Sequence, residues 1–173
     1  QELLDIPVYL MTEPELAAEP ALDIRPWGWD AALRKRLSGL GVDESLLPSM
    51  QQISVWREYS HRSKSVSLLP ELQLNEHFCG ESYYLKTPEE WKSFVEEREG
   101  CLLKAPLSGS GKGLNWCKGT FTPFISGWCT RVAALQGGVI AEPIYNKVED
   151  FALEFYSDGA GEVTFAGYSL FRT

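Results

Sequence analysis

The segment from Cys101 to Leu114 constrains the fold of this chain more than any other. It opens with Cys-Leu-Leu-Lys, which is typical of a short buried strand, and continues as Ala-Pro-Leu-Ser-Gly-Ser-Gly-Lys-Gly. Glycines allow backbone N–H groups to turn toward one point, and serine hydroxyls and lysine ammonium groups add donors and charge. The sequence therefore predicts a strand that ends at Lys104 and a flexible loop that can cradle a phosphate.

The order of residues around Lys104 separates the known glycine-loop motifs. A Walker A loop ends in Gly-Lys-Ser/Thr, whereas Lys112 is followed here by Gly113. A dinucleotide fingerprint needs G-x-G-x-x-G before a helix, and the glycine loop of a protein kinase precedes its strand lysine. Because no order matches, another nucleotide fold is indicated. A plain hairpin turn with solvated lysines is the alternative that stays open.

Charge limits the classes of ligand. The chain has 173 residues and a net charge of −8, so it has no basic surplus for a nucleic-acid backbone. Its basic residues are nevertheless partly concentrated in two stretches, 57–64 and 104–118. No apolar run approaches the roughly 20 residues that span a bilayer. We therefore expect a pocket for a small anion, without a nucleic-acid or membrane partner.

The cysteines and the chain ends bear on metal binding and on context. Four cysteines and two histidines lack the C-x-x-C pair and the spacing of a zinc site. Isolated cysteines are usually free in reducing compartments, so a cytoplasmic location with free thiols is expected, although one disulfide stays possible. The chain begins with Gln1 and ends at Thr173 inside a strand-like pattern. We therefore expect a fragment of a longer protein.

Periodicity and capping residues predict an α/β to α+β fold with a mixed sheet, flanking helices and a C-terminal antiparallel hairpin. Helix starts are indicated by Asp30, by Pro48 or Ser49, and by Thr87, which has Pro88 after it and Glu90 three residues later. Residues 120–135 are ambiguous and could be helical. Strands are expected over 6–11, 82–85, 101–106 and 139–144, helices over 30–37, 49–59, 63–72 and 87–98, and a hairpin over 151–157 and 163–171.

This order of elements resembles the ATP-grasp superfamily, which includes D-alanine ligase and biotin carboxylase. The resemblance rests on a helix, a strand lysine, a glycine loop, a further helix, a strand ending Ala-Glu-Pro, an acid and a hairpin. It implies a partial, truncated ATP-grasp fold in two parts. Residues 1–75 would form an α/β segment like the one that precedes the grasp in bacterial members, and residues 76–173 its first, nucleotide-facing half.

The resemblance also assigns roles to residues that bind ATP. Lys104 and the loop would contact the phosphates, Glu142 would lie at the adenine with Tyr145 in the hinge, and Glu149 would hold the ribose. Arg62 matches an earlier phosphate-contacting base. The loop contributes Ser108, Gly109, Ser110, Gly111 and Lys112. By contrast, His61 has no obvious partner, and Trp27 and Trp29 are interpreted as core or domain-packing residues.

The function implied is the nucleotide-binding portion of an ATP-dependent carboxylate–amine or carboxylate–thiol ligase that acts through an acyl phosphate. ATP and Mg²⁺ would be the cofactors, with the Mg²⁺ ligands outside this chain, so the chain alone is expected to be inactive. Its partners would be nucleotide, a small carboxylate and the rest of the parent protein. Two alternatives stay open: a non-catalytic nucleotide-binding or interaction module, and an α+β domain that binds no nucleotide.

Overall fold

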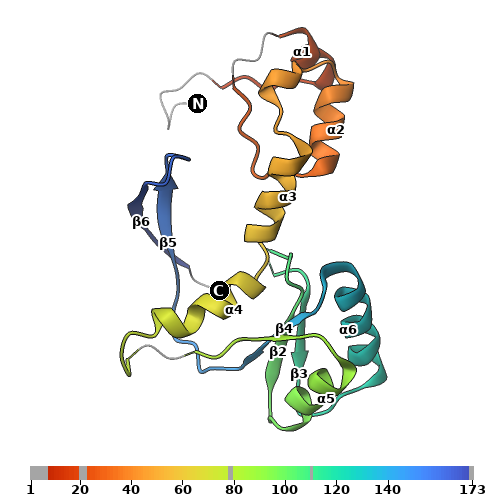
Figure 1. The fold of residues 1–173 in the computed structure, drawn as a ribbon, viewed down its shortest axis with the longest axis vertical. Coiled ribbons are helices and arrows are strands. Elements are labelled where there is room, and N and C mark those ends of the chain that lie inside the picture. The colour runs from red at the N-terminus through yellow and green to blue at the C-terminus, as the bar shows by residue number, and fades with distance from the viewer. Residues whose placement is uncertain (1–7, 20–22, 78–79, 110, 172–173) are drawn as a thin grey trace.

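The computed structural model describes residues 8–19, 23–77, 80–109 and 111–171. They form an upper group of helices and a lower sheet with its own helices, joined through two consecutive helices (Figure 1). The helices are α1 (Glu13–Ala18), α2 (Ala31–Gly39), the 3₁₀ turn η1 (Glu44–Leu46), α3 (Met50–Tyr59), α4 (Ser63–Leu72), α5 (Pro88–Glu96) and α6 (Pro123–Gln136). The strands are β1 (Tyr83–Leu85), β2 (Cys101–Lys104), β3 (Leu114–Cys117), β4 (Val139–Pro143), β5 (Asp150–Ser157) and β6 (Val163–Phe171).

Side-chain caps start the helices that the sequence predicts. The Asp30 carboxylate accepts a hydrogen bond from the Leu33 N–H at 2.7 Å and begins α2. Ser49 and Thr87 begin α3 and α5 as reciprocal capping boxes. Each cap satisfies N–H groups that have no partner within the helix. These three helix starts are confirmed, and the ambiguous segment 120–135 is helical as α6.

The strand order in the main sheet is β1-β4-β2-β3, and every described pairing is antiparallel. The expectation of a mixed sheet was therefore wrong in its detail, although the broader expectation of combined helices and strands is confirmed. The element after the glycine loop is also a strand, β3, and not a helix. β2 and β3 pair directly, with Lys104 opposite Leu114, so the loop connects two neighbouring antiparallel strands.

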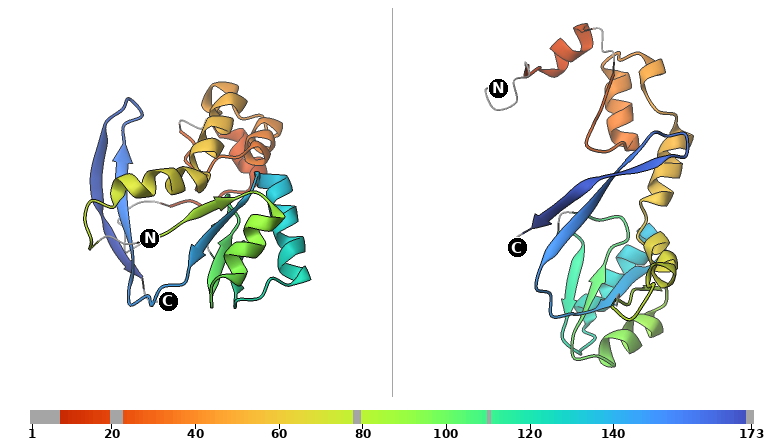
Figure 2. Two further views of the ribbon diagram at one scale, coloured as in Figure 1. Left: turned by 60° about the horizontal axis from the view of Figure 1, so that its bottom comes forward. Right: turned by 90° about the vertical axis from the view of Figure 1, so that its left-hand side faces the viewer.

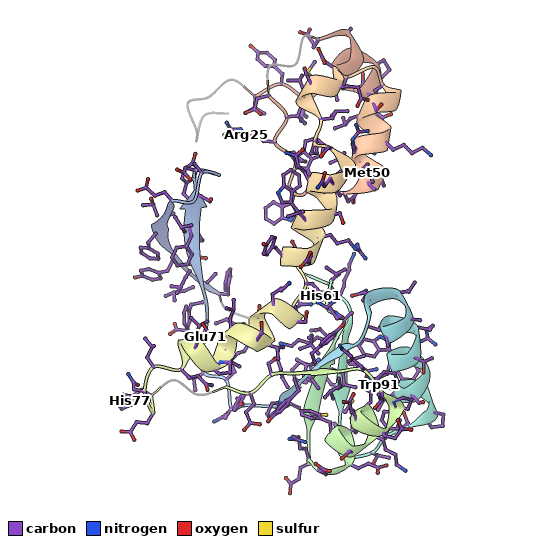
Figure 3. All side chains as sticks on the ribbon, viewed as in Figure 1. Arg25, Met50, His61, Glu71, His77 and Trp91 are labelled. Carbon is purple, nitrogen blue, oxygen red and sulfur yellow. The ribbon has the colours of Figure 1, made fainter. Side chains whose placement is uncertain are left out.

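The core lies between one face of this sheet and helices α5 and α6, which cover that face together (Figure 2). Leu103 is fully buried at its centre, and Trp91 of α5 is directed into the same lower unit (Figure 3). Along β2 the burial alternates, because successive side chains of a strand point to opposite faces. The buried core residues are Trp91, Phe94, Val95, Cys101, Leu103, Ala105, Cys117, Ile125, Cys129, Val132, Val139 and Ala141.

Residues 8–75 contain helices and turns but no strand within their described parts. The segment 8–11 has no regular structure, and residues 6 and 7 of the strand expected there lie outside the described residues. The described part of residues 1–75 is therefore helical, and the α/β organisation expected for the whole segment stays a prediction. Residues 61 and 62 moreover hydrogen-bond to the sheet unit, so the lower unit extends upstream of residue 76 through α4. No helix among the described residues is long and apolar enough to cross a bilayer.

The hairpin β5–β6 is confirmed, and it extends away from the main sheet (Figure 1). Its strand register places one row of apolar side chains on a single face, each between 55% and 68% exposed. The Phe155 and Phe165 rings on this face pack together, with centroids 5.6 Å apart. The apolar hairpin face consists of Phe151, Leu153, Phe155, Phe165, Tyr168 and Leu170. A two-stranded hairpin is marginal in water, so this face adds little to the stability of the described chain.

Two leucine substitutions are expected to show that the core contributes more to stability than the hairpin does. Leu103→Ala should lower the free energy of unfolding by about 2–5 kcal/mol, because Leu103 is completely buried and truncation leaves a cavity. Leu153→Ala on the apolar hairpin face should cost less than about 1 kcal/mol, because Leu153 is already half exposed. Urea unfolding measures both changes. Equal losses would show that the hairpin is covered in solution.

Candidate functional site

The open face of the sheet carries a hollow of about 510 Å³ on the side away from α5 and α6. Leu102 and Lys104 point into it from β2, and their register partners on β3, Trp116 and Leu114, continue the same face. Residues 143–150, which lead from β4 to β5, supply its rim, including Tyr145. We call this hollow the sheet cleft. Its volume suits a small organic ligand.

Basic side chains dominate the charge of the sheet cleft. Among the described residues, its lining includes four cations, Arg62, Lys104, Lys112 and Lys147, and one carboxylate, Asp150. Lys147 pairs with Asp150 at 2.5 Å. Lys104 forms an ion pair with Glu142, which lies beside it on β4. The cleft is therefore cationic, although the whole chain carries a net charge of −8.

Arg62 connects the start of α4 to the base of the glycine loop. Its Nη1 donates to the Ala105 carbonyl at 2.7 Å and to the Ser108 hydroxyl oxygen at 2.8 Å. The Ser108 hydroxyl in turn donates to the Ala105 carbonyl at 2.9 Å. These partners are neutral, so the guanidinium keeps its positive charge uncompensated by them. An anion in the cleft can therefore interact with Arg62.

His61, which precedes Arg62 in the chain, forms two side-chain hydrogen bonds that its sequence context did not reveal. Figure 3 shows His61 where α3 passes into α4, above the sheet. Its Nε2 lies 2.9 Å from the Gln136 carbonyl, and its Nδ1 lies 2.7 Å from the Ser63 hydroxyl. Because a carbonyl only accepts, Nε2 carries the proton and Nδ1 accepts from Ser63. This pair of bonds joins the α3–α4 junction to the C-terminal end of α6.

The glycine loop closes with backbone hydrogen bonds. The Ala105 N–H donates to the Gly113 carbonyl at 2.8 Å, and the Lys112 N–H donates to the Gly109 carbonyl at 3.0 Å. Gly111 and Gly113 have φ angles of +73° and +68°, a region that glycine adopts without steric cost. Lys112 forms no ion pair with another described residue. Ser110, also predicted to bind phosphate, lies outside the described residues.

The loss of stability caused by three alanine substitutions in this loop should follow the backbone geometry at each glycine. A Cβ on Gly113 would lie 2.7 Å from the Ser108 Cβ, in addition to the positive φ, so Gly113→Ala should cost about 2–3 kcal/mol. Gly111→Ala meets nothing within 4 Å and should cost only its conformational term of about 1 kcal/mol. Gly109→Ala, without close neighbours or a positive φ, is the control and should cost little. Thermal unfolding measures the order, and an equal loss for all three would contradict it.

The structure brings most of the predicted site residues together, but not all of them. Arg62, Lys104, Gly111, Lys112 and Tyr145 line the sheet cleft. Glu142 lies at its edge through its pair with Lys104, and it also accepts from the Ser82 hydroxyl at 3.3 Å. Ser108 and Gly109 belong to the loop that borders the cleft.

The acid at the rim is Asp150, since Glu149 is exposed and is not among the residues that line the cleft. Sequence reasoning also missed Trp116, because its strand was not recognised. Its signal was present as the alternation in Leu-Asn-Trp-Cys after the last loop glycine. Lys147 and Asp150 had the weaker signal of an oppositely charged pair three residues apart.

The described residues contain no group of three or more His, Cys, Asp or Glu side chains that could hold a metal ion. They therefore supply no ligand set for the Mg²⁺ that an ATP-grasp ligase uses. Three cysteines, Cys101, Cys117 and Cys129, are free and buried, whereas Cys79 lies outside the described residues. Compared with protein-family models, curated proteins and solved structures, the chain matches none of them.

Proposed function

We propose that the sheet cleft binds a nucleoside triphosphate, and that the chain is the nucleotide-binding portion of an ATP-dependent ligase. One observation carries the first part: four basic side chains and one carboxylate surround a largely apolar hollow in an acidic protein. A polyanion with a flat apolar end fits both properties. Small inorganic anions would use only the charge.

The apolar part of the cleft suits the base. Trp116 is 62% exposed, so one face of its indole is free to stack on a purine. Leu102, Ile144 and Tyr145 provide further apolar surface around it. Stacking of a base on an aromatic side chain contributes about 1–3 kcal/mol. The Glu142 carboxylate, on the same face, offers an acceptor for the exocyclic amino group of adenine.

The basic part of the cleft suits the phosphates. Arg62 presents a planar guanidinium that can bind phosphate oxygens in a bidentate manner, and Lys104 and Lys112 add point charges from a strand and from the loop. Backbone N–H groups of the glycine loop can add further donors. Lys104 is neutralised by Glu142 in the free chain. Bound phosphate would share Lys104 with that carboxylate.

The reaction class rests on the resemblance to the ATP-grasp superfamily. Such a ligase would transfer a phosphoryl group from ATP to a carboxylate, and an amine or thiol would then displace phosphate from the acyl phosphate. This chain would supply positioning and charge, which phosphoryl transfer chiefly requires. Its metal ligands would come from elsewhere in the parent protein, so turnover by this chain alone is not expected. The free thiols Cys101, Cys117 and Cys129 support a reducing, cytoplasmic location.

A second candidate, a non-catalytic interaction module, is favoured by the apolar hairpin face. Exposed contiguous apolar surface of this kind commonly marks a protein–protein contact. In this alternative the cleft would still bind nucleotide, but without a reaction. Continued sequence beyond Thr173 with carboxylate and amide metal ligands would favour the ligase.

Calorimetric titration with ATP, adenosine and inorganic tripolyphosphate tests the nucleotide proposal. ATP should bind more tightly than either part alone, because it uses the indole and the cations together. Raising the salt concentration should weaken ATP and tripolyphosphate binding but leave adenosine nearly unchanged. Equal affinity for ATP and tripolyphosphate would show that the cleft binds anions without contacting the base. If ATP produces no binding heat up to about 1 mM, the Kd is weaker than a value that corresponds to a binding free energy near −4 kcal/mol, and the proposal is refuted.

A further inference from the structure

A second hollow, of about 540 Å³, lies between the upper helices and the glycine loop and is lined by three indoles. Trp27 and Trp29 come from the segment before α2, Trp56 and Arg57 come from α3, and Leu107 comes from the loop below. We call it the indole pocket. The interpretation of Trp27 and Trp29 as core or domain-packing residues was wrong for Trp27, which is fully exposed, while Trp29 is half-buried.

The α3 side of the indole pocket follows from helical spacing. Ile53, Trp56, Arg57 and Ser60 are separated by three, four and seven residues from the first of them, so they share one face of the helix. Ile53 is buried and anchors this face, while Trp56 is 43% exposed. Figure 3 shows α3 between Met50 and His61, the helix that joins the upper group to the sheet unit.

Two other residues of the lining, Asp30 and Leu107, are held in place by hydrogen bonds. The Asp30 carboxylate that borders the pocket is committed to the N-terminus of α2, where it accepts from Leu33 at 2.7 Å. Leu107 is held from the sheet unit, because its N–H donates to the Gln136 side-chain oxygen at 2.7 Å. The pocket is therefore lined from α3, from the segment that leads into α2 and from Leu107, and its lining does not include the tip of the glycine loop.

Charge sets the kind of ligand. The Arg57 side chain forms no ion pair or hydrogen bond with another described residue, and the nearby Asp30 carboxylate accepts the Leu33 N–H at the start of α2. Among the described residues the lining has one cation, Arg57, and one carboxylate, Asp30, so Arg57 is the charged group left to contact a ligand. Indole faces favour flat rings through stacking, and a guanidinium matches a carboxylate through two parallel N–H···O bonds. A planar aromatic carboxylate satisfies both requirements at once.

We propose that the indole pocket binds a planar aromatic carboxylate, with its ring against the indoles and its carboxylate on Arg57. Binding itself does not depend on the nucleotide site. The further assignment of this ligand as the carboxylate substrate of the ligase rests on the proposed function. Leu107 of the pocket and Ser108, which contacts Arg62 of the sheet cleft, are adjacent in the chain. The two sites are therefore neighbours at the base of one loop.

Nuclear magnetic resonance of the indole N–H groups tests this proposal, because each tryptophan gives its own signal. 2-Naphthoate should shift the signals of Trp27, Trp29 and Trp56 with a Kd of about 1 mM or lower, as expected for a ligand of this size. Two matched probes separate its features: 2-naphthamide lacks the charge, and cyclohexanecarboxylate lacks the aromatic ring. Both should bind at least about 10-fold more weakly, which is 1.4 kcal/mol.

Variants assign the contacts. Arg57→Gln should weaken the binding of 2-naphthoate about 10-fold, so that it binds no more tightly than 2-naphthamide. Trp27→Ala should weaken the binding of every aromatic probe. Trp27 is fully exposed, so this variant should fold as the parent does. Trp116→Ala, an exposed indole in the other site, is the control and should leave 2-naphthoate binding unchanged. Shifts confined to Trp116, equal affinity for the charged and neutral probes, or no shift at about 10 mM would overturn the proposal.

The same spectra distinguish this proposal from the proposed function. ATP should shift Trp116 and not Trp27. If ATP binds but 2-naphthoate does not, the indole pocket proposal fails and the nucleotide proposal stands. If 2-naphthoate binds but ATP does not, the pocket is confirmed as a ligand site and its assignment to a ligase substrate fails.

Discussion

Lys104→Met is expected to weaken ATP binding by about 10–100-fold, because it removes a charge-assisted contact worth about 1.5–3 kcal/mol. Lys104 stands at the end of β2, where the strand fixes its position, and its side chain is only 22% exposed. Adenosine binding should be almost unchanged, because the phosphate contact is absent in both proteins. Calorimetric titration of the two ligands into each protein measures the difference.

Glu142 provides the matched control for this result. Lys104→Met leaves the Glu142 carboxylate without its cation, so a loss of ATP binding could reflect repulsion by that charge. The double variant Lys104→Met with Glu142→Gln removes the unpaired charge, and ATP should still bind weakly. Glu142→Gln alone should strengthen tripolyphosphate binding severalfold, because it frees Lys104. Recovery of full ATP affinity in the double variant would show that Lys104 does not contribute to phosphate binding.

Cys129 is expected to resist alkylation in the folded protein by a factor of about 10³ at pH 8. Burial raises the pKa of its thiol from the ordinary 9.0 to about 12, and the side chain has no exposed surface. Only the thiolate reacts, and its fraction at pH 8 falls about 1,000-fold when the pKa rises from 9.0 to about 12. Peptide mapping by mass spectrometry after iodoacetamide treatment gives the rate for Cys129 itself, with the urea-unfolded chain as reference. A rate equal to that reference would show that the core is open.

The same pKa shift predicts the direction of alkaline instability. Between the unfolded pKa near 9.0 and the folded value of about 12, the unfolded chain releases a proton that the folded chain retains. The contribution of the Cys129 thiol to the free energy of unfolding is therefore fully present below pH 9. It declines as the pH rises toward 12, by up to about 1.4 kcal/mol per pH unit. Cys129→Ala should flatten this slope in urea unfolding at pH 9–11, even if it lowers stability at pH 7. An unchanged slope would assign the alkaline loss to other groups.

Local sequence signals were sufficient for the helix starts and for the hairpin. Thr87 with Glu90 defines a capping box within four residues, and the alternation around the Asp158–Gly161 turn defines β5 and β6. Lys104 at a strand end followed by a glycine loop was also readable, because it depends on neighbours along the chain. Each of these features is decided by interactions over a few residues, where periodicity and capping act.

The composition of the site depended on contacts between distant segments. The antiparallel pairing of β2 with β3 and β4 brings Trp116 and Glu142 to the face of Lys104, and the α3–α4 junction brings Arg62 to Ser108 across 46 residues. The choice of Asp150 over Glu149 at the rim, and the exposure of Trp27 in a pocket, also depend on how the units pack. The sequence alone determined the starts of α2, α3 and α5 and the β5–β6 hairpin, where capping and turn residues act over a few positions, whereas the strand expected over 6–11 is not found at 8–11 and β3 was missed. Only the tertiary structure decided which side chains of the elements meet, because sheet order and helix docking depend on burial between residues far apart in the chain.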